Sequence, residues 1–491
     1  MSSSQTFNLC DEAWIPINTG QSVSLKDVFA QPDLAFPAGN PVQKIAVFKL
    51  LLAIAQAACT PTDEADWEAL SPEDFRRRCL EYLDKWHDRF DLYGERPFLQ
   101  MPSVSKAKVL PFEALCPEKA SGNTTRLTQL QNAVPLTDAD KALLLVQTMN
   151  FAFGGKKADN SIVLSSGYTG KSKSGRPGPS LGSLGYLHSF ALVSGLARSL
   201  WLNLMSLEDI RAMQIFPQGP GKAPWEEMPK SEDCEVAEVL RQSLIGRLMP
   251  LSRFCLLTEQ GMHCTEGLAY NGPKEGGYEP SMTVELGAKE IKPILVNPEK
   301  RPWRSLTAIL SFMHSGAAGK TRFDTRQMAI ALGRVGRRAL QDEITIWSGG
   351  MRVSAKAGEQ YMSGSNDYVE SECLLSVSMV VESWYLTFMR QMALLDAMSS
   401  ALYGAVMGYY QEFKVQGKQR AAQAANRFWL DAEAGFQDLV DACALGEEAL
   451  KPVHADNQKR FINAYNEACP HETPRQVIAW VKHMKKDKKN D

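Results

Sequence analysis

Two stretches of the chain come close to a phosphate-binding loop, which needs the pattern G-x-x-x-x-G-K-[S/T] between a strand and a helix. The first, SSGYTGKS at residues 165–172, has Ser165 where the first glycine belongs. Pro177, shortly after it, blocks the helix whose N-terminus would face the phosphates. The second, HSGAAGKT at residues 314–321, has His314 at that glycine position and follows a helix-like run. A phosphate-loop NTPase is therefore the alternative function, not the favoured one.

Metal and nucleophilic chemistry have no complete set of residues either. Cys255, His263 and Cys264 are close in sequence, but a structural zinc site takes four ligands and no second ligand pair appears. The 7 histidines form no HxxxH motif and no triad spacing. The 10 cysteines contain no CxxC pair, which is typical of reduced, buried thiols in a cytoplasmic protein. We therefore predict a cytoplasmic protein that is not an enzyme and has no metal site and no cofactor.

A segment rich in Gly, Ser, Lys and Pro at residues 165–185, here called the glycine loop, is better suited to contacting DNA. The minor groove of a duplex is about 6 Å wide, so only backbone without bulky side chains approaches its floor. The glycines available for this are Gly167, Gly170 and Gly175. Lys171 and Lys173 would hold the flanking phosphates. A plain surface loop is the alternative interpretation.

The distribution of charge also favours a local anionic partner. The net charge of −2 and pI of about 6.4 argue against a protein that coats nucleic acid with its whole surface. Residues 156–176, however, contain five basic side chains against Asp159 alone, and residues 300–338 contain nine against Asp324 alone. These runs predict defined anionic contact surfaces, with solvated helix faces as the alternative.

The elements that position these residues belong to a large folded chain. At 491 residues with 44% hydrophobic side chains, the usual domain size of roughly 100–200 residues suggests two to four domains. The best candidate for a membrane span, residues 45–59, is interrupted by Lys49, so we predict no span. The N-terminus has no basic-then-apolar export signal.

The periodicity of apolar residues predicts mixed secondary structure before residue 365. Alternation in residues 7–24 predicts a short sheet, and residues 162–164 could form a short strand. Helices are predicted at residues 41–59, 72–89 with Ser71 as cap, 142–153, 187–205, 305–314 and 324–340.

After residue 365 the pattern changes to amphipathic helices with short breaks between them. These helices are predicted at residues 374–413, 418–443, 454–469 and 474–486. Four helices with short connections favour an antiparallel bundle. The predicted fold is α+β, with a nucleic-acid-recognition domain at residues 1–365 and a four-helix bundle at residues 366–491.

Two strings near the N-terminus carry a family resemblance. FNLCDEAWIPI at residues 7–17 and FDLYGERPFLQM at residues 90–101 resemble the large subunit of the type I-E CRISPR Cascade complex, the CasA family. The resemblance implies a non-catalytic subunit that recognises the protospacer-adjacent motif from the minor groove and opens the duplex for R-loop formation. It implies as partners guide RNA, double-stranded target DNA, the other Cascade subunits and a helicase-nuclease.

The resemblance also assigns DNA-contacting residues. The family's glycine loop is similar to GYTGKSKSG at residues 167–175. The family's lysine finger follows a Tyr-x-Gly turn, which resembles YNGPKEGG at residues 270–277 with Lys274 as the lysine. GGMR at residues 349–352 resembles a Gly-Gly-aromatic-Arg turn that leads to a strand-separating wedge. Where that wedge has a glutamine, this chain offers Ser354, Ala355 and Lys356.

A weaker part of the resemblance concerns RNA. SGNTTRLTQLQ at residues 121–131 falls where the family extends a loop towards the 5′ handle of the guide RNA, so Asn123, Thr124 and Arg126 are candidate contacts. A transcriptional DNA-binding protein, the remaining alternative, would bind duplex without RNA, but no helix-turn-helix signature is present.

Overall fold

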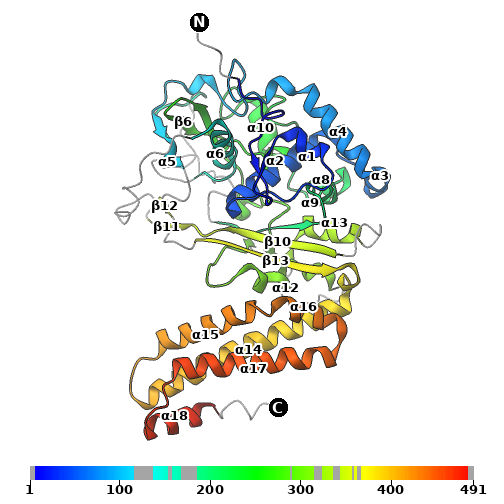
Figure 1. Cartoon of the computed structure of the whole chain (residues 1–491). Helices are drawn as coiled ribbons and strands as arrows, with labels where there is room; N and C mark the ends of the chain where they lie inside the picture. The colour runs from blue at the N-terminus through cyan, green and yellow to red at the C-terminus, as the bar shows by residue number, and fades with distance from the viewer. Residues whose placement is uncertain are drawn as a thin grey trace. The chain divides into compact units, whose positions relative to one another are not determined.

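The computed structural model describes residues 6–115, 136–152, 158–166, 185–287, 290–314, 323–335, 343–356, 359–361 and 367–484. The chain divides into two compact units, residues 1–312 with 318–372 and residues 313–317 with 373–491. The first unit mixes helices with short antiparallel sheets and the second is helical (Figure 1). The predicted α+β class is therefore confirmed. The domain boundary expected at residue 365 stays a prediction, because it lies among residues that the structure does not describe.

The first unit contains most of the elements. Its helices are α1 (Leu25–Ala30), α2 (Pro41–Cys59), α3 (Glu64–Ala69), α4 (Pro72–Lys85), α5 (Phe112–Leu115), α6 (Asp138–Asn150), α8 (Leu196–Leu202), α9 (Leu207–Met213), α10 (Glu235–Arg241), α11 (Leu244–Leu248), α12 (Leu306–Ile309) and α13 (Arg326–Val335). Its single-turn 3-10 helices are η1 (His87–Arg89), η2 (Pro102–Val104), η3 (Pro273–Glu275) and η4 (Pro302–Ser305), and η5 (Ser311–Met313) crosses into the second unit.

The strands form five small sheets. Two are two-stranded, β1 (Ile15–Pro16) with β2 (Ser22–Val23) and β11 (Ser354–Lys356) with β12 (Glu359–Tyr361). Three have three strands each, in the orders β3 (Val109–Pro111), β6 (Gly261–Glu266), β5 (Arg253–Leu257); β8 (Ile291–Pro293), β7 (Val284–Leu286), β9 (Phe323–Asp324); and β13 (Tyr368–Ser376), β10 (Glu343–Met351), β4 (His188–Leu192).

Helix α2 forms the core of the first unit. It begins at Pro41 because Asn40 accepts a hydrogen bond from the Gln43 backbone while the Gln43 side chain accepts one from Asn40, a capping box. Its length and apolar composition are those of a membrane span, yet 83% of its apolar window is buried inside the protein. It packs against α4, α6, α8, α11 and β10. The helix is hydrophobic all round because other elements surround it.

Local signals predicted several elements correctly. Helix α2 has the expected bounds, and Ser71 caps α4 by accepting a hydrogen bond from Asp74 N at 3.0 Å. Helix α6 begins four residues earlier than expected, at Asp138, since Thr137 and Asp140 form a capping box. The sheet expected near the N-terminus is the β1–β2 pair.

Two predicted elements are wrong. Residues 187–205 are not one helix but strand β4 followed by α8. All five residues of β4 are buried, and a strand buried on both faces has no alternation that separates it from a helix. Residues 162–164 form no strand; instead the backbone N–H groups of Leu164 and Ser165 donate to the carboxylate of Glu232.

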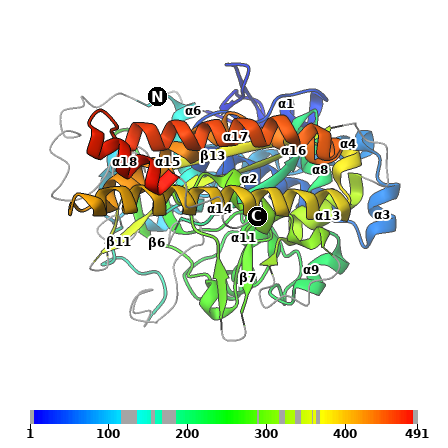
Figure 2. The same cartoon turned by 90° about the horizontal axis from the view of Figure 1, so that it is seen from below.

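The second unit is an up-down-up-down bundle whose second member is broken. Its helices are α14 (Glu382–Glu412), α15 (Lys418–Glu433), α16 (Phe436–Leu445), α17 (Glu447–Ala468) and α18 (Pro474–Met484), preceded by η6 (Val377–Met379). The long helices lie side by side in both overall views (Figures 1 and 2). The break is at Gly435, where a Cβ would lie 2.4 Å from the Arg460 guanidinium. Helix α17 begins before the expected residue 454 and runs through Pro452, within its first two turns. Residues 374–376, expected to be helical, belong to β13.

Candidate nucleic-acid interface

One end of the β13–β10–β4 sheet receives several of the predicted DNA-contacting segments. Strand β4 starts there and β10 ends there, with Gly349 opposite His188 in the antiparallel register. Gly185, the last residue of the glycine loop, accepts a hydrogen bond from Val296 N at 2.9 Å. Its φ of +69° is in the left-handed region, and a Cβ on it would lie 2.2 Å from the Met351 carbonyl oxygen. The glycine loop thus ends directly against the end of β10.

The beginning of the glycine loop is also fixed. Leu164 N lies 3.0 Å and Ser165 N 2.8 Å from carboxylate oxygens of Glu232, whose side chain is buried. The Ser165 hydroxyl in turn accepts from Asp233 N at 3.3 Å. The predicted contacts themselves lie outside the described residues; they are Gly167, Gly170, Lys171, Lys173 and Gly175.

The segment of residues 270–277, here called the lysine loop, contains the 3-10 turn η3 and is closed by backbone hydrogen bonds. Lys274 is the central residue of η3, and Gly277 N closes the loop by donating to the Gly272 carbonyl at 2.9 Å. Gly276 has φ +83°. Arg247 donates from Nη2 to the Asn271 carbonyl at 2.7 Å. The structure describes the backbone of Lys274 but not its side chain, so its role as a DNA contact stays a prediction.

A buried group of charges lies beneath the lysine loop. Lys49 Nζ of α2 is 2.7 Å from Glu279 Oε2, and both side chains are fully buried. His188 Nδ1 of β4 lies 3.8 Å from the same carboxylate and 2.9 Å from the Ser281 hydroxyl. Burial lowers the pKa of His188 to about 4 and lowers the pKa of Lys49. His188 is therefore neutral at pH 7, and the lysine loop is connected through Glu279 to both the core helix and the start of β4.

Arg247 completes this support. It is a buried residue of α11, burial lowers its pKa, and its guanidinium lies 5.3 Å from the centre of the Tyr270 ring. The Tyr270 hydroxyl accepts a hydrogen bond from Leu251 N at 3.1 Å. A Cβ on Gly277 would lie 2.8 Å from Arg247 Nη2, so the glycine permits the close approach. Only one hint of this cluster is visible in the sequence, a lysine inside an apolar helix.

The predicted wedge lies on a β-ribbon. Gly349 and Gly350 are residues of strand β10, so the expected Gly-Gly-aromatic-Arg turn is wrong. These glycines allow close packing, since a Cβ on Gly350 would lie 2.6 Å from Val296 Cγ2 and 2.8 Å from the Tyr186 carbonyl oxygen. Strand β11, which contains the predicted wedge residues, pairs with β12, and Figure 1 shows this ribbon prolonging β10 and β13.

The register of the ribbon and its base are defined by the backbone. Ser354 lies opposite Tyr361, Ala355 opposite Gln360 and Lys356 opposite Glu359. At the base of the ribbon, Arg352 Nε donates to Asp367 Oδ1 at 2.9 Å and Arg352 N donates to the Asp367 carbonyl at 2.8 Å. The two strands that carry the ribbon are thus tied together by a buried carboxylate.

The predicted guide-RNA contacts, Asn123, Thr124 and Arg126, lie outside the described residues. Helix α5 precedes them in the chain and helix α6 follows them. The C-terminal side begins at α6, where Asp138 accepts a hydrogen bond from the Tyr93 hydroxyl at 2.5 Å and pairs with Lys141 at 3.0 Å.

Cys255 and Cys264 face each other across the β5–β6 pair with 3.4 Å between their sulfur atoms. Both thiols are buried, and burial holds the pKa of Cys255 well above its ordinary value. His263 Nδ1 donates to the Ala107 carbonyl at 2.5 Å. Within the described ranges, no three His, Cys, Asp or Glu side chains are grouped as metal ligands would be.

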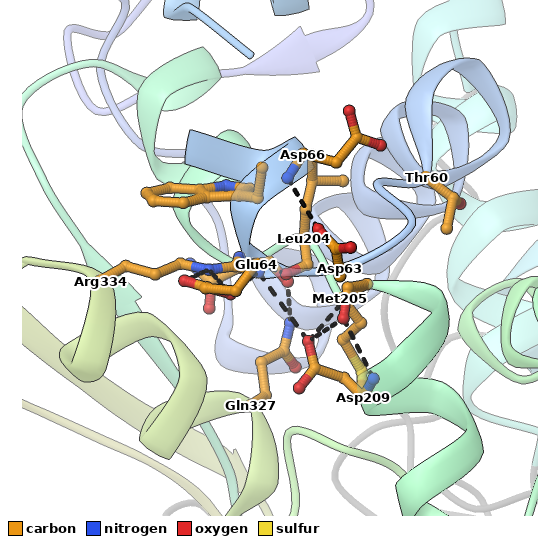
Figure 3. Close-up of polar contacts among 12 residues, drawn as sticks. Thr60, Asp63, Glu64, Asp66, Leu204, Met205, Asp209, Gln327 and Arg334 are labelled. Carbon is orange, nitrogen blue, oxygen red and sulfur yellow. Dashed lines mark hydrogen bonds and ion pairs between the residues drawn. The ribbon is translucent and has the colours of Figure 1, made fainter. Parts of the chain in front are cut away.

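The basic run at residues 300–338 is not a uniform surface patch. Arg334 is fully buried; it bonds to both Glu64 carboxylate oxygens and to the carbonyls of Leu202 and Leu204, and lies 4.3 Å from the centre of the Trp67 ring (Figure 3). This residue joins α13 to α3 and to the segment after α8. Sequence composition could not separate such a structural arginine from a surface one.

Comparison with known proteins identifies the family. The profile of the CRISPR-associated protein Cse1 family matches residues 8–468. The chain belongs to this family. Its resemblance to the large subunit of type I-E Cascade is thereby confirmed, and Cse1 (CasA) proteins are subunits of that CRISPR surveillance complex.

Individual relatives agree with this assignment. The chain is 33% identical over 174 residues to CasA/Cse1 of Thermus thermophilus, a segment that spans 32% of this chain and 33% of that protein. The structure of Thermobifida fusca Cse1 matches with a TM-score of 0.75 at 20% identity over 98% of both chains. A chain of a CRISPR RNA-guided surveillance complex matches with a TM-score of 0.68 at 16% identity, covering 97% of this chain and 98% of that one. At these identities the structural matches establish the Cse1 fold.

Proposed function

We propose that this Cse1 family member is a non-catalytic subunit that recognises a protospacer-adjacent motif in the minor groove of double-stranded DNA. It then opens the adjacent base pairs so that the guide RNA can pair and form an R-loop, and it helps to recruit a helicase-nuclease. It acts in the cytoplasm within Cascade. In this division of labour the protein reads a short motif and base pairing reads the sequence.

The observation that carries this proposal is the convergence of three segments on one sheet end. The glycine loop ends at Gly185 against the end of β10, and the ribbon with the wedge residues continues from β10. The lysine loop leads into Ser281, whose carbonyl accepts a hydrogen bond from Ser189 N of β4 at 2.9 Å. The segment that reads the groove and the segment that separates the strands must act on neighbouring base pairs. Segments attached to the same end of one sheet are suited to that.

The chemistry of each segment fits its proposed step. Glycine backbone fits the narrow groove, and Lys274 can donate to the base acceptors that A·T pairs present there. Unstacking a base step costs a few kcal/mol. The opened duplex therefore needs a protein group that occupies the space between the separated strands and a positive charge near their phosphates. A ribbon is thin enough to enter between them, and Lys356 can neutralise a separated phosphate although it cannot stack. Asn123, Thr124 and Arg126 are the proposed contacts to the guide-RNA handle.

The phosphate-loop alternative is weakened by one observation. A phosphate loop follows a strand, because the strand directs the loop towards the helix N-terminus. Residues 162–164 form no strand, and the adjacent Ser165 N–H, which a phosphate would use, already donates to Glu232. The non-catalytic assignment therefore remains our proposal.

The decisive experiment uses the complex reconstituted with guide RNA and partner subunits. Gly170→Val should abolish binding of motif-bearing duplex but leave binding of pre-opened target strands nearly unchanged, because only the groove contact is lost. Lys274→Ala should weaken motif binding by roughly tenfold, as one specific contact contributes on the order of 1–3 kcal/mol. Lys85→Ala, an exposed lysine on α4, is the matched control. Filter binding measures all affinities. Equal motif affinity for wild type and both loop variants would refute the proposed recognition.

A further inference from the structure

A second site that the proposed DNA recognition does not use lies between residues 89–103 and 224–230. There the first unit has a pocket of about 590 Å³, within the range of roughly 300–1,000 Å³ that small-molecule sites occupy. Its charged lining residues are Arg89, Arg96, Lys230 and Glu95. Arg89 is paired with Asp88, so Arg96 and Lys230 against Glu95 leave a surplus of one positive charge. The pocket is therefore chemically suited to an anion.

These cations are available to a ligand. Arg96 and Lys230 are exposed, and neither forms an ion pair with any residue that the structure describes. Two carboxylates near Lys230 in sequence are not ion-paired with these cations: Glu227 pairs with Lys222 at 2.8 Å, and Glu226 accepts from the Tyr82 hydroxyl at 2.7 Å. Arg89 is held by Asp88 at 3.4 Å. Two unengaged cations on opposite segments of one pocket can reach the same bound group.

The pocket is also rigid. Prolines restrict both segments, at positions 97, 102, 224 and 229. The buried Gln100 side chain donates to the Leu92 carbonyl at 2.8 Å and accepts from Leu257 N at 2.8 Å. The preceding residue, Leu99, has φ +54°, a left-handed conformation that a branched side chain rarely adopts. A lining held this firmly is preorganised, which lowers the entropic cost of binding.

The floor of the pocket is apolar. Trp225 packs against Phe90 and Phe98, with ring centres 5.5 and 6.0 Å away. Its indole N–H donates to the Tyr82 hydroxyl at 2.8 Å. Trp225 is buried, and Met228 beside it is half-buried and lines the pocket. The site therefore combines a cationic rim with an apolar floor, which matches a group that has both a phosphate and a flat, weakly polar part.

We infer that this pocket binds a single nucleotide, with its phosphate at Arg96 and Lys230 and its base or ribose on the floor beside Trp225 and Met228. A duplex is too wide for a pocket of this size, so the ligand is a free mononucleotide or the phosphorylated end of single-stranded RNA. The inference does not depend on the DNA recognition proposed above, because the pocket residues belong to neither the glycine loop nor the lysine loop.

The test uses the full-length chain and two probes. The first is a short RNA with a 5′-phosphate and a 3′-fluorescein, measured by anisotropy against the same RNA with a 5′-hydroxyl. The second is AMP, used as competitor and measured alone by calorimetry. We compare wild type with the Arg96→Gln, Lys230→Gln double variant, and use Lys85→Gln, Lys418→Gln as a control with the same charge change. All four side chains are exposed, so these variants should fold.

We expect saturable binding of at least one probe, weakened roughly tenfold or more in the pocket double variant and less than about twofold in the control. Preference for the 5′-phosphate RNA, with AMP competing, identifies an RNA end as the ligand. Binding of AMP without competition by RNA identifies a free nucleotide. No saturable binding of either probe overturns the inference, as does equal weakening in both double variants. Loss of assembly with partner subunits at unchanged nucleotide affinity would overturn it in favour of a protein interface.

Discussion

At the scale of single residues, the buried ion pair of Lys49 and Glu279 is the least expected feature of the chain. Removing two charges from water is costly, and the interior compensates only when the partners are close and held in place. Here Glu279 is also close to His188, while the same segment continues from the lysine loop. The cluster of Lys49, His188 and Glu279 therefore fixes the position of the segment that follows the lysine loop. Three apolar side chains of similar volume would fix it less specifically, because they form no directional contacts.

Glu279→Gln tests the cluster directly. Without the carboxylate, Lys49 keeps a buried charge with no counter-charge, so the free energy of unfolding should fall by about 3–5 kcal/mol. Urea denaturation at pH 7 measures the loss. Glu275→Gln changes an exposed carboxylate in the same loop and should cost less than about 1 kcal/mol. Similar losses in the two variants would mean that the ion pair does not hold the fold.

His188 predicts a specific pH dependence of stability. Its pKa is about 4 in the folded protein against an ordinary 6.5, so between these values the unfolded chain binds more protons. The contribution of His188 to the free energy of unfolding should therefore be fully present above about pH 6.5. It should be lost, by up to about 3 kcal/mol, as the pH falls to about 4. His188→Gln should remove this part of the dependence. Urea unfolding at pH 7.5 and 4.5 measures it, and parallel profiles for both proteins would contradict the assignment.

At the scale of elements, local signals predicted helices α2 and α4 but failed for strand β4. Asn40 and Ser71 are caps that act within their own turns, so α2 and α4 could be read from the sequence. Strand β4 depends on β10, far along the chain, as the 2.9 Å contact of the Ser189 and Ser348 hydroxyls illustrates. Nothing next to β4 in sequence encodes that pairing.

The candidate site, too, could be predicted only in part from the sequence. Composition predicted that residues 165–185 form a loop, and the resemblance proposed Lys274 as a DNA contact, but neither could place the two segments relative to each other. The described end of the glycine loop, Gly185, lies at the start of β4 because of contacts such as that with Met351, which form only in the folded unit. The pocket with Arg96 and Lys230 was missed because its two segments are separated in sequence and each alone is an ordinary charged loop.

The ribbon of β11 and β12 gives the prediction at this scale. In the proposed mechanism Lys356 neutralises a separated phosphate rather than stacking, so Lys356→Ala should slow strand opening at low salt and become relatively less harmful at high salt. Ala355→Gly, next to it on β11, should change the opening rate little and serves as control. A fluorescent base analogue in fully paired target reports the rate. An unchanged rate in Lys356→Ala would locate the wedge elsewhere.

At the scale of the whole molecule, the two units differ in whether their elements come from neighbouring or from distant parts of the sequence. The bundle is built from helices adjacent in sequence, whereas the first unit takes its last strand from residues that follow the ribbon. Within the first unit, Glu370 of β13 accepts from Lys44 Nζ at 2.7 Å and from the Trp347 indole at 3.0 Å. Strand β13 is therefore part of the fold that carries the predicted DNA-contacting segments.

This arrangement predicts where the chain can be cut. A fragment of residues 1–376 keeps β13 and should unfold cooperatively, whereas a fragment ending at residue 365 lacks the carboxylates of Asp367 and Glu370. Arg352 and Lys44 then lose their counter-charges, and β10 loses an edge strand. The shorter fragment should be less stable by on the order of 3 kcal/mol or more. Urea unfolding and the near-ultraviolet circular dichroism of both fragments measure this difference.

The same pair of fragments separates the roles of the two units in the complex. If the motif is read by the first unit alone, complexes assembled with residues 1–376 should bind motif-bearing duplex within about threefold of the intact protein, far less than the tenfold expected for loss of a specific contact. Recruitment of the helicase-nuclease should be impaired, because the bundle is missing. Duplex binding and nuclease pull-down are measured on the same preparations. A 1–376 fragment that is folded yet no longer distinguishes motif from non-motif duplex would show that the bundle takes part in reading the motif. A fragment without cooperative unfolding would show instead that the two units share one core.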